Sequence, residues 1–176
     1  EPDKNYYKRV VTGAVRGVDY IASLPEWDGK TIGVTGASQG GFLSLATAAL
    51  DKRITFLGVV HDAMCDYEAE VHNVGGGWPH PFYWDIKSGI DKTLLEKKVE
   101  GARYYDGVNF ARRITQPGWY SFGYNDETVP PTSSYSTYNI IKAPKTLSVY
   151  QMTGHFWYQE QWDEWQEFLK KEMGVE

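Results

Sequence analysis

Apolar residues recur along the chain at two spacings, which predict two kinds of element. Between Asn5 and Ser23 they lie three or four positions apart with polar residues between them, which is typical of an amphipathic helix. Short apolar runs rich in β-branched residues instead predict buried parallel strands. The predicted strands are Thr31–Thr35, Phe56–Val60, Gly118–Gly123 and Thr146–Tyr150.

Helical patterns separate these strands and follow the last one. The predicted helices are Phe42–Leu50, Asp106–Ile114, Pro130–Ile141 and Tyr158–Met173. An alternation of strands and helices favours an α/β fold, with a mostly parallel sheet flanked by helices.

Residues 62–103 do not fit this alternation. They contain a run of three glycines, several aromatic residues and two modest helical patterns, Ala63–Val71 and Thr93–Tyr104. We interpret them as an insertion over the carboxyl edge of the sheet, within a single domain spanning residues 1–176. The chain begins without an initiator methionine, so we expect a processed product or a part of a longer protein.

The composition narrows the class of partner. A formal net charge of −5 without a basic block gives little support to a nucleic-acid partner. No apolar run approaches the ~20 residues of a membrane span, so we expect no membrane partner. A single cysteine, Cys65, cannot form an internal disulfide and does not indicate a compartment.

The most informative local motif is Gly36-x-Ser38-x-Gly40, between a predicted strand and a predicted helix. That context is the one in which a nucleophilic serine lies on a sharp turn, with glycines two residues before and after it because side chains there would collide. The turn would direct the Gln39 N–H at a reacting carbonyl, as an oxyanion donor. The alternative is a chance pattern in a glycine-containing loop.

A serine hydroxyl needs a base, and the chain has four histidines, His61, His72, His80 and His155. His155 follows the last predicted strand and precedes the last helix, which is where the base of such a triad occurs in chain order. We therefore predict that His155 is the base. The alternative is a histidine of a surface loop.

Two aspartates follow strands and are candidates for the acid that orients the base. Asp126 follows the third predicted strand and lies between Ser38 and His155 in the chain, as the order serine, acid, histidine requires. Asp62 follows the second strand and is the rival, because an acid on a neighbouring strand still reaches the imidazole. We favour Asp126 on order and position.

The segment His61–His72 contains carboxylates, a cysteine and two histidines, which are residue types that bind metal ions, so we consider a metal site there. Zinc ligands usually come in close pairs such as Cys-x-x-Cys or His-x-x-x-His, and neither spacing occurs. Asp62, Asp66 and Glu70 would share one helix face, which we interpret as a solvated surface. The sequence predicts neither a metal nor a cofactor.

With these residues in hand, the chain resembles the acetyl xylan esterase and cephalosporin C deacetylase family of carbohydrate esterases. The most specific match is the serine motif Gly36-Ala37-Ser38-Gln39-Gly40-Gly41. The other matching stretches are Tyr6–Val10, Tyr104–Ala111, Asp126–Pro131 and Tyr138-Asn139. The spacings among Ser38, Asp126 and His155 also agree with the family's triad.

The resemblance implies an α/β-hydrolase fold of which this chain is the carboxyl-terminal half, with the early strands missing. It implies Ser38 as nucleophile, Asp126 as acid, His155 as base and Gln39 as one oxyanion donor. The implied reaction is removal of acetyl groups from small acetylated carbohydrates through an acetyl-serine, without a cofactor. The implied assembly is a homo-oligomer, or pairing with the missing amino-terminal half.

Two departures from the family accompany this resemblance. Phe156-Trp157 follow the histidine where the family commonly has glutamate, and the loop that donates the second oxyanion hydrogen bond is absent. The chain alone is therefore expected to be a poor catalyst. A peptidase or lactone hydrolase on the same fold, and a non-catalytic sugar-binding or assembly module, are the alternatives.

Overall fold

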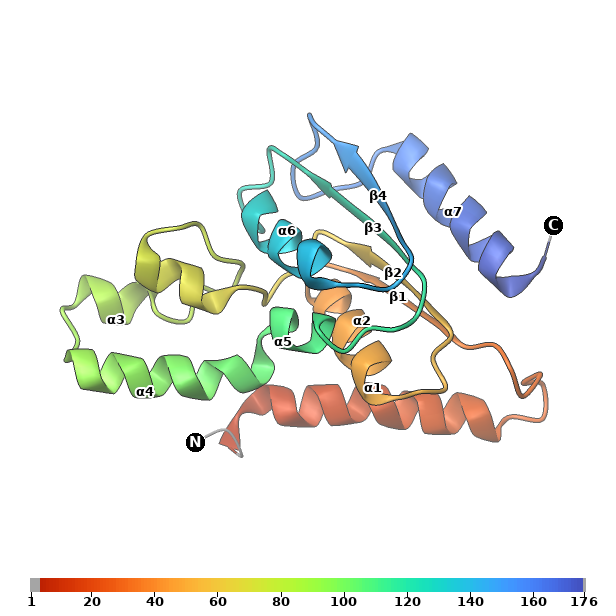
Figure 1. Cartoon of the computed structure of the whole chain (residues 1–176), viewed down its shortest axis with the longest axis horizontal. Helices are drawn as coiled ribbons and strands as arrows, with labels where there is room; N and C mark the ends of the chain where they lie inside the picture. The colour runs from red at the N-terminus through yellow and green to blue at the C-terminus, as the bar shows by residue number, and fades with distance from the viewer. Residues whose placement is uncertain (1–3, 176) are drawn as a thin grey trace.

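Four parallel strands form one sheet in the computed structural model, which describes residues 4–175 (Figure 1). The strands are β1 (Gly33–Ala37), β2 (Phe56–Val60), β3 (Gly118–Gly123) and β4 (Lys145–Tyr150). They lie in the order β1-β2-β3-β4, and each neighbouring pair is parallel. All four carboxyl ends therefore meet at one edge of the sheet.

Helices connect and cover the strands, which confirms the predicted α/β class. The α-helices are α1 (Tyr6–Ser23), α2 (Gln39–Leu50), α3 (Tyr83–Lys87), α4 (Lys92–Ala102), α5 (Gly107–Ala111), α6 (Pro131–Ile140) and α7 (Gln159–Met173). Two 3₁₀ segments, η2 (Tyr67–His72) and η3 (Arg103–Tyr105), also occur in the described part of the chain.

The two faces of the sheet pack against different helices. Leu57 and Val59 of β2 join a buried cluster with Leu45 of α2. The alternate residue Phe56 contacts Phe168 of α7, with ring centroids 5.9 Å apart. Because successive side chains of a strand point to opposite faces, α2 and α7 cover opposite faces of the sheet, as Figure 1 also shows.

The first strand lies two residues later than the sequence predicted. It spans Gly33–Ala37 rather than Thr31–Thr35, and its residues pair with those of β2 up to Ala37 opposite Val60. Gly36, which lies beyond the end of the predicted strand, is part of β1. Ser38 is consequently the single residue between β1 and α2.

The segment between β2 and α5 extends away from the sheet and from α7, with α3 and α4 at the left of Figure 1. It is anchored by a second buried cluster in which Tyr67, Phe82 and Val99 pack with Phe42 of α2. The packing of these side chains holds the segment against α2.

The helix predicted over Ala63–Val71 is wrong. Met64 and Asp66 both have a left-handed backbone, each with a φ of 59°, which an α-helix does not tolerate. Only the short 3₁₀ segment η2 forms after them. The expected helical face of Asp62, Asp66 and Glu70 is therefore not formed, and Asp62 is 3% exposed rather than solvated.

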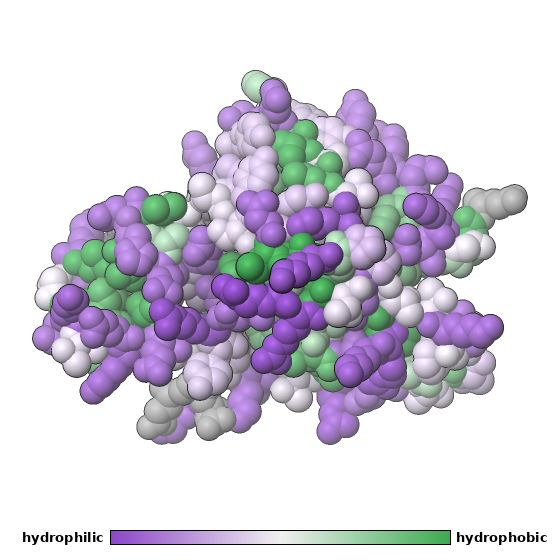
Figure 2. All heavy atoms as spheres, in the orientation of Figure 1, coloured by the Kyte–Doolittle hydropathy of each residue, from purple (hydrophilic) through white to green (hydrophobic). Residues whose placement is uncertain are grey.

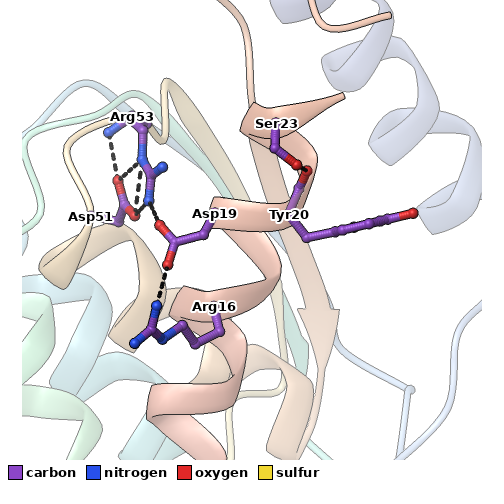
Figure 3. A network of polar contacts seen from close by, with 6 residues as sticks. All are labelled: Arg16, Asp19, Tyr20, Ser23, Asp51 and Arg53. Atoms are coloured by element: carbon purple, nitrogen blue, oxygen red, sulfur yellow. Dashed lines mark hydrogen bonds and ion pairs between the residues drawn. The ribbon is translucent and has the colours of Figure 1, made fainter. Parts of the chain in front are cut away.

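A polar network attaches α1 to the end of α2 (Figure 3). Arg53 donates to the Asp51 carboxylate through Nε, at 2.9 Å, and to Asp19 of α1 through Nη2, at 2.6 Å. Arg16 pairs with the same Asp19 at 3.4 Å. The Arg53 guanidinium thus joins α1 to the end of α2.

The face of the molecule shown in Figure 2 is mostly polar, with apolar patches that include one over the α3 and α4 region. Among the helices of residues 4–175, none combines the length and the apolar character that a membrane crossing requires.

Candidate active site

Ser38 occupies a strained turn at the carboxyl end of β1. Its φ of 57° and ψ of −122° lie outside the conformations that side-chain-bearing residues usually adopt. The turn is held on both sides, because the Ser38 N–H donates to the Val60 carbonyl at 3.0 Å and its own carbonyl accepts from Ala63 N–H at 3.1 Å. The half-buried serine is therefore fixed at the sheet edge.

The two glycines of the motif differ in their steric role. A Cβ built on Gly36 would lie 2.5 Å from the backbone carbonyl carbon and oxygen of Gly40, so a side chain there collides with the turn. A Cβ built on Gly40 would meet nothing within 4 Å among the described residues. The expected collision therefore applies to Gly36, and the close approach needs no glycine at position 40.

Gln39 is the first residue of α2. Its backbone N–H lies in the first turn of the helix, where no carbonyl of the same helix accepts from it. A free N–H beside Ser38 at the positive end of a helix is suited to stabilise a negatively charged oxygen. The Gln39 side chain is engaged elsewhere, since its Nε2 donates to the Tyr7 hydroxyl at 2.7 Å.

His155 and Asp126 form a hydrogen bond, with His155 Nδ1 2.8 Å from Asp126 Oδ2. An ionised carboxylate only accepts, so Nδ1 is the donor, and in the neutral imidazole Nε2 is then left without a proton. This tautomer is the one that a general base requires. The His155 side chain is 28% exposed, while that of Asp126 is fully buried.

Backbone groups fix Asp126 behind the imidazole. Its Oδ1 accepts from the Thr128 and Val129 N–H groups at 2.9 and 2.8 Å. The loops after β3 and β4 are also joined directly, because Asn125 N–H donates to the Thr153 carbonyl at 3.1 Å. The loops that carry Asp126 and His155 therefore form one connected unit.

The rival acid, Asp62, is directed elsewhere. Its Oδ2 accepts from the Thr137 hydroxyl at 2.6 Å and from the Cys65 thiol at 3.2 Å. Burial raises the pKa of the Asp62 carboxyl to about 6, against the opposing effect of the Thr137 and Cys65 hydrogen bonds. Asp62 thus belongs to a buried network beneath the loop after β2.

A second histidine lies against the first. His61 directly follows β2, is 3% exposed, and packs against His155 in a tilted arrangement, with ring centroids 4.3 Å apart and an interplanar angle of 42°. Its backbone is strained, with a φ of 34°, and its Nδ1 is buried without a hydrogen-bond partner. Burial, and then the neighbouring His155, lower the pKa of His61 to about 4 against the opposing effect of Asp126, so the ring is neutral near pH 7.

The other two histidines lie in the segment between β2 and α5. His72 is exposed at the end of η2, and His80 Nδ1 lies 2.9 Å from a carboxylate oxygen of Glu70. The contact between His61 and His155 has one sequence signal, which is the position of each histidine just after a predicted strand. The sequence analysis treats His61 as a candidate base and as part of the segment considered for metal ligands, and does not predict its contact with His155.

The model of the acetyl xylan esterase family, AXE1, matches residues 1–172. The chain belongs to the acetyl xylan esterase family. The acetyl esterase Axe7A of Xylanibacter ruminicola is 44% identical to it over 154 residues, which are 88% of this chain and 34% of Axe7A. The family resemblance seen in the sequence is therefore confirmed.

Solved structures agree with membership of the acetyl xylan esterase family. The acetyl xylan esterase from Paenibacillus sp. R4 superposes with a TM-score of 0.88 and 29% identity, covering 98% of this chain and 55% of that one. The α/β hydrolase GrgF from Penicillium sp. sh18 shares the fold, with a TM-score of 0.70 and 16% identity over 96% of this chain and 73% of its own. The predicted α/β-hydrolase class is confirmed.

This member of the acetyl xylan esterase family spans about a third of Axe7A and about half of the Paenibacillus enzyme. Its matched part contains the serine turn, the Asp126–His155 pair and the sheet edge that carries them.

Proposed function

We propose that the protein containing this chain is a serine esterase that removes acetyl groups from acetylated carbohydrates. The observation that carries the proposal is the arrangement at the sheet edge. A strained serine begins a helix at the end of β1, and an aspartate-bound histidine follows β4. Both relatives named acetyl esterases support the acetyl group as the one removed.

In the proposed reaction, the Ser38 hydroxyl attacks the acetyl carbonyl while His155 Nε2 accepts its proton. The Gln39 N–H stabilises the oxyanion of the tetrahedral intermediate. The protonated His155 then gives its proton to the leaving sugar oxygen, and an acetyl-serine remains. Water, deprotonated by His155, attacks this ester and releases acetate, which restores Ser38.

Asp126 supports both steps through its hydrogen bond to His155 Nδ1. It keeps Nε2 free of a proton before attack and stabilises the imidazolium that forms afterwards. The carboxylate keeps its two backbone donors throughout, so the imidazole does not need to be repositioned between the steps.

One oxyanion donor is assigned to this chain, whereas sites of this kind use two. We propose that the part of the fold that the solved relatives have beyond this chain supplies the second donor. Loss of one such donor typically costs ~10²–10³ in turnover. The chain alone is therefore expected to be slower than the whole protein by about that factor.

A fluorophosphonate probe tests the nucleophile directly on the 176-residue chain. We expect one label per molecule, located on Ser38 by peptide mapping, and no label in Ser38→Ala. In Asp126→Asn the labelling rate should fall by about 10³–10⁴, because the amide does not hold the required histidine tautomer. Ser23→Ala, which removes an exposed hydroxyl at the end of α1, is the control and should label as the wild type does.

The substrate class is tested on the whole protein by measuring acetate released from acetylated xylo-oligosaccharides. Butyryl esters and acylated peptides serve as comparison substrates. Faster cleavage of the peptides than of the acetyl esters would contradict the proposal, as would labelling that persists in Ser38→Ala.

A further inference from the structure

Three potential metal ligands converge at the carboxyl edge of the sheet. One nitrogen of His61, one nitrogen of His155 and one carboxylate oxygen of Asp126 all lie within 4.8 Å of one another. They come from three neighbouring strands, since His61 follows β2, Asp126 follows β3 and His155 follows β4. The parallel sheet therefore brings together residues that are 65 and 29 positions apart, by 126 − 61 and 155 − 126.

The ligand types match one class of ion. Two imidazoles with one carboxylate suit zinc and copper, while magnesium and calcium prefer sites built from oxygen alone. We propose that His61, Asp126 and His155 bind a single divalent zinc-type ion, which acts as an inhibitor of the hydrolase site and not as a cofactor.

His61 is the residue for which the proposed hydrolase mechanism provides no role. His61 is 3% exposed, its Nδ1 has no hydrogen-bond partner among residues 4–175, and its backbone has a positive φ of 34°. A buried polar atom without a partner is costly, and a strained residue persists only where its surroundings hold it in place. Coordination of an ion through Nδ1 would give this atom a partner.

The groups around the cluster favour a defined site. Asp126 Oδ1 keeps its two backbone donors, which leaves Oδ2 as the oxygen that faces His155. The His61 N–H donates to the Ser121 carbonyl at 2.8 Å, so β3 also holds the second histidine. Such outer contacts orient metal ligands. The 28% exposure of His155 provides a route for the ion.

A modest contraction completes the site. Ligands of one tetrahedral zinc ion lie roughly 3.3–3.5 Å apart, given zinc–ligand bonds of about 2.0–2.1 Å. The Asp126–His155 pair, at 2.8 Å, would open slightly, and the widest pair would close from at most 4.8 Å. His155 lies in the loop between β4 and α7, which is where this movement would occur.

Inhibition follows from the chemistry of the imidazole. Coordination through His155 Nδ1 replaces its hydrogen bond to Asp126 and places the single proton of the neutral ring on Nε2. A protonated Nε2 does not accept the proton of Ser38. The binding site itself does not depend on the proposed function, whereas its inhibitory effect does.

Zinc binding is measured by isothermal titration calorimetry on the 176-residue chain after treatment with a chelator. We expect one zinc ion per chain, and an affinity at least tenfold lower in His61→Ala. The matched control is His72→Ala, which removes an exposed imidazole outside the cluster and should bind as the wild type does. Equal affinities of wild type and His61→Ala, or a wild type that binds no zinc at 1:1, would overturn the proposal.

Two further variants keep the test decisive. His155→Ala changes a partly exposed loop residue and must also weaken zinc binding at least tenfold, so it decides the outcome if circular dichroism shows that His61→Ala is unfolded. Ser38→Ala should bind zinc as the wild type does, although it takes no fluorophosphonate label. A wild type that binds zinc but takes no fluorophosphonate label counts against the esterase, and a wild type that takes the label but binds no zinc counts against the metal site.

Inhibition is read from the rate of fluorophosphonate labelling at Ser38. Zinc at about ten times the dissociation constant of the wild type should slow this rate about tenfold in the wild type and at most about twofold in His61→Ala. Equal slowing in both proteins would show that the ion acts elsewhere.

Discussion

At the scale of single residues, the serine turn depends on one close approach between backbones. A side chain at position 36 would collide with the Gly40 carbonyl at 2.5 Å, while a side chain at position 40 would extend into open space. The two glycines of one motif therefore differ in their steric constraint. Position 36 is constrained by contact, and position 40 carries no steric constraint within the described chain.

The two alanine substitutions should have opposite effects on stability. We expect Gly36→Ala to lower the free energy of unfolding by about 1–3 kcal/mol, because the turn must shift to admit the methyl group. Gly40→Ala should raise it by up to about 1 kcal/mol, because alanine is the better helix former near the start of α2. Urea unfolding followed by circular dichroism measures both. Equal destabilisation by the two substitutions would contradict this account.

At the scale of elements, Arg53 provides polar contacts that attach α1 to the end of α2. Its guanidinium contacts the buried Asp51 carboxylate and Asp19 of α1, whereas Arg16 reaches only Asp19, at 3.4 Å. The hydrogen bond from the Arg53 side chain lowers the pKa of the Asp51 carboxyl, against the opposing effect of desolvation. Loss of Arg53 therefore removes a partner that Arg16 does not replace.

We expect Arg53→Met to lower the melting temperature by roughly 2–4 °C at pH 7, and the matched Arg16→Met to change it by less than about 1 °C. A carboxyl with a lowered pKa in the folded state contributes stability above its unfolded pKa, and this contribution is lost as pH falls through the folded pKa. The difference between wild type and Arg53→Met should therefore shrink below about pH 4. A difference that grows on acidification, measured by calorimetry, would refute this role.

Much of the element pattern could be predicted from the sequence because strands and helices with strong periodicity are local features. β2 and β3 begin and end where their apolar runs do. The segment after β2 was mispredicted as a helix, because the left-handed backbone of Met64 and Asp66 is imposed by packing and leaves no trace in hydrophobic spacing.

The candidate site also has a part that the sequence predicts and a part that it does not predict. Ser38 and Gln39 belong to a local motif, and chain order favoured Asp126 and His155 as partners, which the structure brings to 2.8 Å of each other. The contact of His61 with His155 depends on the order of strands in the sheet, which spacing along the chain does not encode. The sequence therefore predicts which residues lie at the ends of strands, but not which of their side chains contact one another in the folded chain.

At the scale of the whole molecule, β1 is the first strand of the sheet and pairs only with β2 among the described strands. Gly33 and Thr35 of this edge are exposed. An unpaired strand edge is a template for pairing with another chain. We propose that the isolated chain self-associates through β1, or pairs there with the rest of its parent protein.

Self-association should appear as an average mass above the 20.0 kDa of one chain that rises with concentration in sedimentation experiments. Thr35→Lys should lower this mass toward that of one chain, because a lysine on an edge strand disfavours edge-to-edge pairing. Thr12→Lys makes the same change on the exposed face of α1 and is the control. A mass of one chain at every concentration would rule out association through this edge.

The order of the strands also affects how far apart the side chains of His61, Asp126 and His155 lie. Neighbouring strands lie about 4.7–4.9 Å apart, and His61, Asp126 and His155 follow three consecutive ones. The sheet brings the three residues to one edge, and the short loops after β3 and β4 bring their side chains closer than the strands, since the rings of His61 and His155 lie 4.3 Å apart although β2 and β4 are not neighbours. Insertions farther along these connections would leave the distances intact, so the surroundings of the site are free to diversify while the arrangement of these three side chains is preserved.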